Sequence, residues 1–268
     1  MVIQKAPEAL RRTGRSIPAL SRSFGALAAV AAAGGTLWLL DSLCAPAPHS
    51  VTEDVPIVAA APVPAGAGES GGQGDSASRE TAQAWLSRIS TDADIPRRAL
   101  RAYASADLAM REIAPNCHLS WTMLAGIGRI ESNHGRFAGA LLADNGTETR
   151  PVIGIPLDGS AGIENVPDTD HGALDGDTVH DRAVGPMQFL PGTWRGWASD
   201  GNGDGTADPQ NVDDAALTAG RYLCAGGKDL ATGHGWWSAV LSYNDSLDYA
   251  QRVFAGAEAA ARTAAAAE

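Results

Sequence analysis

Apolar residues recur at helical spacing through most of the chain beyond residue 80. After Pro96, a residue suited to the first turn of a helix, Leu100, Tyr103, Leu108 and Ile113 fall on one face. Similar patterns predict further helices at Ala82–Ile89, Trp121–Asn133, Pro191–Ala198, Asp213–Cys224 and Trp236–Ala255. Residues 139–182 are instead rich in Gly, Asp and Pro, with one β-like piece at Val152–Leu157. The sequence therefore predicts a mainly α, α+β domain with a long insertion and a small β element.

The regions on either side of this domain have a different composition. Residues 1–41 join a basic leader to an apolar run from Phe24 to Leu40, the pattern of an export signal that is either retained as an anchor or cleaved. Residues 42–79 are rich in Pro, Ala, Gly and Ser and predict a linker. Residues 256–268 are rich in Ala and predict a disordered tail. The folded domain is thus expected to span 80–255, outside the cytoplasm.

Charge and cysteine content narrow the function further. The net charge of −11 argues against a nucleic-acid partner, because phosphate backbones require basic surfaces. Export permits disulfides, and Cys117 and Cys224 lie in the predicted folded region whereas Cys44 does not. We expect one bridge, Cys117–Cys224. We also expect a monomer, although the sequence does not determine the oligomeric state.

Glu131 stands at the end of an apolar stripe on the predicted 121–133 helix, in line with Trp121, Leu124 and Gly128. A carboxyl group in that place is partly desolvated. Desolvation raises its pKa, so the group stays protonated near neutral pH and can donate a proton. The alternative is a surface glutamate paired with a nearby arginine.

Two other segments present groups suited to sugar recognition. Gly185-Pro-Met-Gln188 forms a turn before a helix, and the Gln188 amide can bind an N-acetyl or hydroxyl group. Tyr243 and Asn244 end an apolar helical run and place an aromatic ring beside an amide. Each segment alone is weak evidence, since packed turns and helix ends look alike.

Together the three segments resemble the lytic transglycosylase superfamily, which has a lysozyme-like fold. The matching pieces are Gly-Arg-Ile-Glu131-Ser-Asn-His-Gly, Ala-Val-Gly-Pro-Met-Gln188-Phe-Leu-Pro and Ser-Tyr243-Asn244, in the family's order and spacing. The likeness is greatest to the B-type membrane-bound lytic murein transglycosylases and covers roughly residues 95–255. It implies Glu131 as the acid/base, with Gln188, Tyr243 and Asn244 binding peptidoglycan glycan strands. The products would carry 1,6-anhydro-N-acetylmuramic acid ends. The insertion at 139–182 departs from the family pattern.

A loop after Trp194 has the spacing of a calcium site. Oxygen donors fall at positions 1, 3, 5, 7 and 9 of an EF-hand-like pattern: Asp200, Asn202, Asp204, the Thr206 carbonyl and Asp208. Position 12 is Asn211 rather than glutamate, so we expect weak binding. B-type enzymes carry a similar loop here. We predict a structural Ca²⁺ and no cofactor for catalysis, with a metal-free turn as the alternative.

Three other functions stay open. A hydrolysing muramidase would need a second carboxylate, which the insertion can supply from Asp168, Asp170, Asp175, Asp177 or Asp181. A zinc-dependent wall peptidase or amidase would draw on Asp168, Asp170, His171 and His180, which match no strong zinc spacing. A non-catalytic wall-binding module would keep the cleft without the chemistry.

Overall fold

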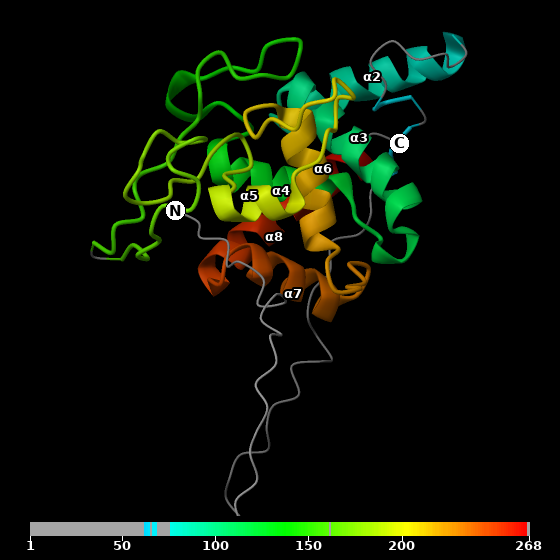
Figure 1. Cartoon of the computed structure of the whole chain (residues 1–268). Helices are drawn as coiled ribbons and strands as arrows, with labels where there is room; N and C mark the ends of the chain where they lie inside the picture. The colour runs from blue at the N-terminus through cyan, green and yellow to red at the C-terminus, as the bar shows by residue number, and fades with distance from the viewer. Residues whose placement is uncertain (1–61, 65, 69–75, 161, 267–268) are drawn as a thin grey trace, which may run out of the picture. The chain divides into compact units, whose positions relative to one another are not determined.

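The computed structural model describes residues 62–64, 66–68, 76–160 and 162–266 (Figure 1). These residues form a mainly helical domain, as the sequence predicts. The helices are α2 (Ser76–Asp92), α3 (Arg97–Ile113), α4 (Trp121–Ser132), α5 (Pro191–Trp197), α6 (Val212–Leu223), α7 (Gly233–Tyr243) and α8 (Leu247–Ala265), with 3₁₀ turns η2 (Pro115–Cys117) and η3 (Phe137–Gly139). The β structure of the described residues consists of isolated bridges. The predicted Val152–Leu157 piece contributes one of them, between Ile153 and Val184.

Helix α4 lies at the centre of the domain, where it packs most extensively against α8 and also against α3 and α6 (Figure 1). Two glycines permit this close packing. A Cβ at Gly126 would lie 2.6 Å from the Val253 carbonyl oxygen of α8, and one at Gly128 would overlap the Tyr103 hydroxyl of α3. Larger residues at these positions would push the neighbouring helices away from α4.

The start of α4 is fixed by two side chains that accept hydrogen bonds from its free N–H groups. Ser120, the N-cap, accepts from the Thr122 N–H at 3.3 Å. Asp107, which is buried on α3, accepts from the Trp121 N–H at 2.8 Å and from Arg111 at 2.8 Å. These contacts hold the direction of α4, and therefore the position of its last turn.

The C-terminal part of the domain differs from the prediction in two ways. The predicted 236–255 helix is broken into α7 and α8, because Asn244 is extended and Ser246 caps α8 by accepting from the Tyr249 N–H. The predicted disordered tail is wrong for residues 256–266. Helix α8 continues to Ala265, and its alanines Ala257, Ala260 and Ala264 are buried. Alanine is the strongest helix former, and its small side chain suits the close contact with α4.

The 139–182 insertion is an irregular lobe beside the helices, in green to yellow-green in Figure 1. Leu157 packs with Ala183 and Leu190 in a small separate core, against which Ile163 and Val166 also pack. This second core gives an otherwise loop-rich segment a defined shape.

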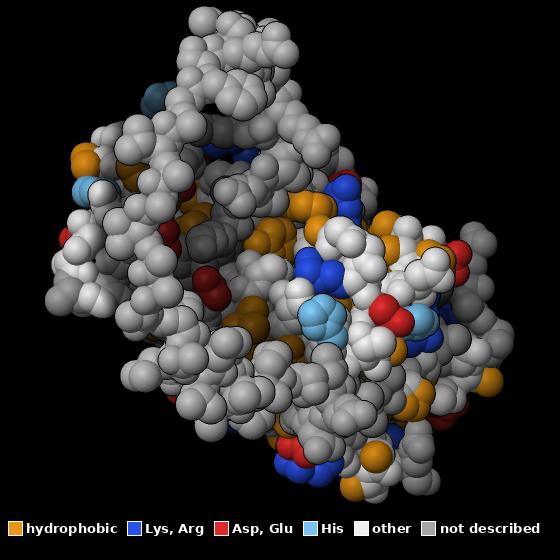
Figure 2. All heavy atoms as spheres, turned by 90° about the horizontal axis from the view of Figure 1, so that it is seen from below, with side chains coloured by type: hydrophobic (Ala, Val, Ile, Leu, Met, Phe, Trp, Pro, Cys, Tyr) orange, Lys and Arg blue, Asp and Glu red, His pale blue; other side chains and the backbone are white. Residues whose placement is uncertain are grey.

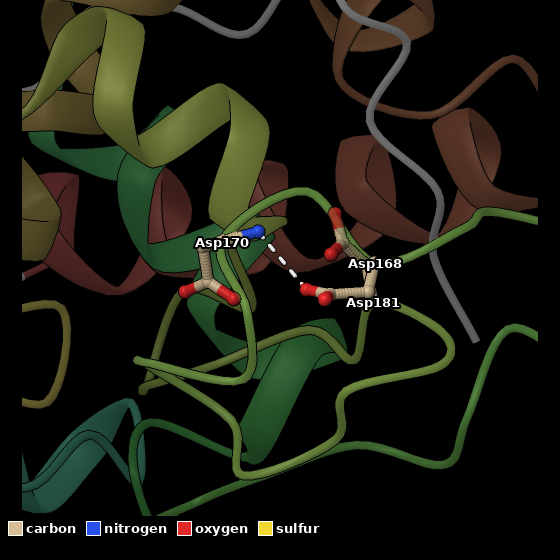
Figure 3. A group of neighbouring side chains, drawn as sticks. All are labelled: Asp168, Asp170 and Asp181. Carbon is tan, nitrogen blue, oxygen red and sulfur yellow. Dashed lines mark hydrogen bonds between the residues drawn. The ribbon is translucent and has the colours of Figure 1, made fainter.

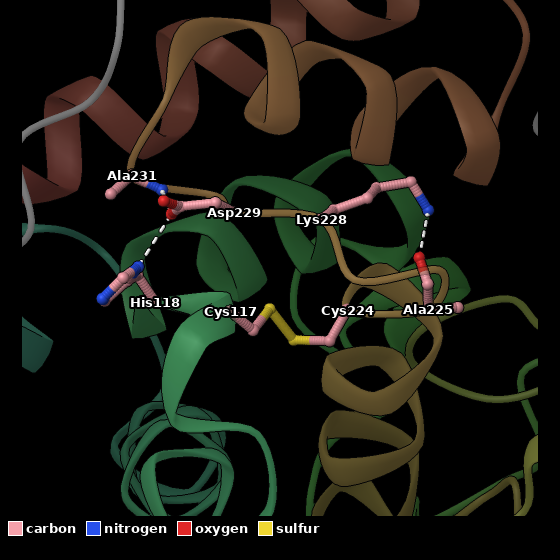
Figure 4. The surroundings of a disulfide bond; sticks show 7 residues. All are labelled: Cys117, His118, Cys224, Ala225, Lys228, Asp229 and Ala231. Carbon is pink, nitrogen blue, oxygen red and sulfur yellow. Dashed lines mark hydrogen bonds and ion pairs between the residues drawn. A yellow bond between two sulfur atoms is a disulfide. The ribbon is translucent and has the colours of Figure 1, made fainter.

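The structure contains the predicted disulfide between Cys117 and Cys224, with Cα atoms 5.6 Å apart (Figure 4). Nearby, His118 and Asp229 are 2.7 Å apart, and the Leu230 N–H donates to the Cys117 carbonyl at 2.8 Å. The bridge therefore ties the segment before α4 to the end of α6. Cys44 lies outside the described residues.

The export signal or anchor at 1–41 and most of the 42–79 linker also lie outside the described residues. The linker prediction is wrong for the part that is described, because Val63 and Ala67 are buried in the main core and α2 begins at Ser76. No helix among those described is long and apolar enough to cross a membrane.

Candidate active site

Glu131 occupies the last turn of α4, where its carboxyl is half-buried and bound by one side chain. The Tyr249 hydroxyl donates a hydrogen bond to Glu131 Oε1 at 2.7 Å. Burial raises the pKa of Glu131 to about 8, against the lowering effect of this hydrogen bond and of the Arg252 charge. A carboxylic acid with this pKa is protonated at neutral pH, which is the state needed to donate a proton.

Tyr249 is a site residue that the sequence analysis missed. It is buried in the first turn of α8, and burial together with the neighbouring Glu131 raises its pKa well above 10, so it stays a donor. Because Oε1 of Glu131 accepts this bond, Oε2 is left as the oxygen that carries the acid proton. Tyr249 therefore positions Glu131.

A cleft of about 770 Å³ opens beside Glu131. Phe137 and Ile155, both about half exposed, line it together with Gly154, so the insertion supplies part of its wall. The volume is within the range of ligand-binding pockets. The exposed aromatic ring of Phe137 offers a flat apolar surface to a sugar ring. The muramidase alternative has the insertion reach the site through its carboxylates, whereas Gly154 and Ile155 are among the residues by which it borders the cleft.

Gln188 and Asn244 line the same cleft as Glu131. Gln188 follows the Gly185 turn, and its amide nitrogen donates to the Gly185 carbonyl at 3.0 Å and to the Ala183 carbonyl at 3.4 Å. This arrangement leaves the amide oxygen to accept bonds from a ligand. Asn244 lies at the break between α7 and α8. The structure therefore gathers three of the four predicted catalytic and sugar-binding residues around one cavity.

Tyr243, the fourth of these residues, does not line the cleft. It is fully buried, and its hydroxyl donates to the Met187 carbonyl at 2.7 Å. Its ring also packs against Phe189 and Tyr222. The sequence motif predicted Tyr243 in the sugar cleft, but the last turn of α7 directs its side chain into the core. Its role is to hold the turn that carries Gln188.

The Asp200–Asn211 loop is organised by backbone N–H groups that donate to carboxylates. Asp200 accepts from the Gly203 and Gly205 N–H groups at 2.7 and 2.8 Å, and Asp204 accepts from Thr206 at 2.8 Å. The fully buried Asp214 anchors the loop, accepting from Gly201 at 2.7 Å and from Asp208 at 2.9 Å. The side chains at positions 1, 3 and 5 are thus bound to one another or to the loop backbone: Asp200 Oδ1 accepts from two N–H groups, and the Asn202 amide nitrogen donates to Asp204 Oδ2 at 2.9 Å.

The position-12 residue does not take part in this arrangement. Asn211 caps α6 by accepting from the Asp213 N–H at 2.9 Å, and its amide nitrogen donates to the Asn145 carbonyl. Asp213 is paired with Arg98. The loop accordingly has oxygen donors for a hard cation at its first positions and lacks the closing bidentate ligand.

Three carboxylates of the insertion lie close together: Asp168, Asp170 and Asp181 (Figure 3). Most of their oxygens organise the loop. Asp181 accepts from the Thr169 N–H and hydroxyl, both at 2.8 Å, and Asp168 accepts from the Asp170 N–H at 2.9 Å. This is the one group of three or more potential ligands that the described residues form, and it contains no histidine or cysteine. Of the predicted zinc candidates, His171 is fully exposed and His180 stands outside the group.

Charged side chains are visible at several places on the face drawn in Figure 2. In the view of Figure 2, basic and acidic groups are interspersed and form no continuous basic patch among the side chains that the figure colours.

Comparison with known proteins finds one family match and one similar solved structure. Residues 180–244, which include Gln188 and Asn244, match the family described as the transglycosylase SLT domain. Among solved structures, the chain is similar to the Escherichia coli lytic transglycosylase Slt35 in complex with bulgecin A, with 14% identity over 68% of this chain and 79% of that one and a TM-score of 0.41. No curated protein matches the chain.

The family match covers the second and third sequence motifs, and the structure joins these to the Glu131 helix around one cleft. The match covers residues 180–244, and assignment of the whole chain to the lytic transglycosylase superfamily is taken up as a proposal below. The assignment to the B-type subclass stays a prediction.

Proposed function

We propose that this chain cleaves the bond between N-acetylmuramic acid and N-acetylglucosamine in peptidoglycan without consuming water, with Glu131 as its single acid/base. The observation that carries the proposal is the cleft itself. Glu131 is the one carboxylate among the described residues that line it, and its pKa is raised to about 8.

The chemistry follows from one carboxyl group acting twice. Protonated Glu131 gives its proton to the glycosidic oxygen, and the bond from that oxygen to the muramic acid C1 breaks. The ionised carboxylate then takes the proton from the C6 hydroxyl, whose oxygen bonds to C1 and closes a 1,6-anhydro ring. Glu131 ends the cycle protonated. Gln188 and Asn244 would hold the N-acetyl and hydroxyl groups, and the Phe137 ring would support a sugar face.

A two-carboxylate hydrolysis is less well supported, because the acidic residues of the insertion do not line the described cleft. Asp168, Asp170 and Asp181 instead accept hydrogen bonds within the insertion. A non-catalytic binding module would not need a carboxylic acid held in its protonated form.

Two finer features belong to this proposal. The Asp200–Asp208 loop would bind Ca²⁺ weakly as a structural ion, supported by the ligand spacing and by the anchoring of the loop on Asp214. The apolar run from Phe24 to Leu40 would hold the enzyme at the outer face of the cytoplasmic membrane, supported by its basic leader.

Glu131→Gln tests the proposal, with Glu148→Gln as a matched control. Glu148 is also buried with a pKa raised to about 8, yet it does not line the cleft. On purified peptidoglycan, Glu131→Gln should lose at least ~10²-fold in rate, as expected for a general acid, whereas Glu148→Gln should stay near wild type. Mass analysis of wild-type products should show anhydro ends. Reducing ends, or an active Glu131→Gln, would refute the assignment.

A further inference from the structure

A second cavity of about 510 Å³ adjoins the cleft. It lies between α4, α8 and the turn joining α2 to α3. Arg129, Ile130 and Arg252 line both cavities, so these three residues form the junction between them. Their side chains therefore border both a ligand seated at Glu131 and one in the second cavity.

The junction is positively charged in a chain whose net charge is −11. Arg129 and Arg252 are the two permanently charged residues among those that line the cleft, and Glu131 beside them is neutral near pH 7 because burial raises its pKa. The ion pair of Arg252 with Asp248 is exposed on both sides, so it offsets little of this charge. Arg129 has no ion pair with any other described residue. The local charge is opposite to that of the whole protein, which favours an anionic ligand.

The far wall of the second cavity carries acidic rather than basic side chains. It carries Asp92, the last residue of α2, and Asp94 on the turn that follows, and Arg136 already binds Asp94 at 2.9 Å. His134, also in the lining, is neutral because burial lowers its pKa to about 3. A ligand that fits has carboxylates near the cleft and tolerates or supplies a positive group at its distal end.

We propose that Arg129 and Arg252 form a subsite for the peptide stem of peptidoglycan, binding its carboxylates where the stem leaves the sugar next to the cleaved bond. This inference rests on the proposed function. The stem is an acidic peptide that contains a diamino acid, so its charges match those of the junction and of the far wall. Guanidinium groups are suited to carboxylates because they donate two parallel hydrogen bonds.

The test compares two forms of one substrate: glycan strands that carry peptide stems, and the same strands after an amidase has removed the stems. The readout is the ratio of kcat/KM for the two forms. A ratio is needed because the Arg252 charge also lowers the pKa of Glu131, so its loss alters cleavage of both substrates. Wild type should prefer stem-bearing strands, and the Arg129→Gln/Arg252→Gln double variant should lose about tenfold of that preference, mainly through KM.

Arg262→Gln is the matched control. Arg262 lies on the same helix, makes the same kind of i,i+4 ion pair, with Glu258, and lines neither cavity. It should keep the wild-type preference, whereas Arg252→Lys should retain part of it. The preference should also weaken with salt in wild type more than in the double variant.

The outcomes separate this inference from the function on which it rests. Anhydro products with the same preference in wild type and the double variant would overturn the stem subsite and leave the proposed function standing. The absence of anhydro products from either strand would refute the proposed function. In that case, binding of a disaccharide tetrapeptide is measured by calorimetry. Weaker binding by the double variant than by wild type would support the stem subsite, and equal binding would overturn it.

Discussion

Replacing Tyr249 with phenylalanine should move the pH dependence of cleavage. The change removes the hydroxyl that donates to Glu131 Oε1 at 2.7 Å and leaves the ring in its buried place. This hydrogen bond lowers the pKa of Glu131 relative to burial alone, so its loss should raise that pKa further above 8. Catalysis requires the protonated acid, and activity therefore falls as pH rises through the pKa. In Tyr249→Phe this fall should occur at higher pH.

The size of the shift follows from the strength of the bond. A hydrogen bond to a charged group contributes about 1.5–3 kcal/mol, and about 1.4 kcal/mol corresponds to a tenfold change in proton affinity. The hydroxyl can also donate to the protonated carboxyl, so the lower end of the range applies. We expect the alkaline limb of kcat/KM to move up by about one pH unit. The rate at neutral pH should also fall, because Glu131 is less well oriented.

The assay is kcat/KM for glycan cleavage from pH 5 to 10, with Tyr243→Phe as the control. The Tyr243 hydroxyl is also buried, but it donates to the Met187 carbonyl rather than to Glu131. Its loss should cost about 1–3 kcal/mol of stability and leave the limb in place. An alkaline limb that stays put, or moves to lower pH, in Tyr249→Phe would refute the role given to Tyr249. A shifted limb in Tyr243→Phe would show that the effect is not specific to contact with Glu131.

Three further outcomes follow from the structure. Burial raises the pKa of Glu148 to about 8, so folding stability should fall as pH rises from about 4.5 to 8. Glu148→Gln should therefore raise the melting temperature more at pH 9 than at pH 4. Equal shifts at the two pH values would contradict the raised pKa of Glu148. Replacing Cys117 and Cys224 together by alanine should cost about 5 kcal/mol by the chain-entropy argument for a separation of 107 residues, and denaturant titration that shows no loss would argue against the bridge. Calcium should raise the melting temperature more than magnesium does, and Asp200→Ala should abolish this rise. Cleavage well below the melting temperature should survive EDTA, because the ion is structural. A melting temperature that calcium does not change would show that the loop is a turn without a metal site.

The sequence predicted the helices best where apolar periodicity coincided with a cap. Ser120 fixes the start of α4 within one turn of its predicted place, and Pro96 does so for α3. The break between α7 and α8 was missed because apolar residues continue at helical spacing on both sides of it. Only the Ser246 cap marks the new helix. The helical end of the domain was missed because alanine carries little hydrophobic signal, and its burial depends on Gly126 of a distant helix.

The site residues, too, could be predicted only where the signal is local in the sequence. Glu131 was found because the apolar stripe that desolvates it is local to one helix. Tyr249 was not, because its bond to Glu131 spans 118 residues and leaves no pattern in either segment. Tyr243 was assigned to the cleft because the family motif pairs it with Asn244, yet Tyr243 ends α7 and Asn244 is extended, so only Asn244 reaches the cleft. The contribution of Ile155 depends on the course of an irregular loop, which periodicity does not describe.

The pairing of α4 with α8 also sets when the site can come into existence. Ribosomes deliver α4 long before α8, so the helix that carries Glu131 leaves synthesis or export without the helix that carries Tyr249 and Arg252. Until α8 docks, the apolar face of α4 around Gly126 is uncovered and Glu131 is open to water, where a carboxyl group is ionised at neutral pH. Under the proposed function, a chain that has emerged only as far as α4 therefore lacks a working acid, and cleavage can begin only once α8 has docked.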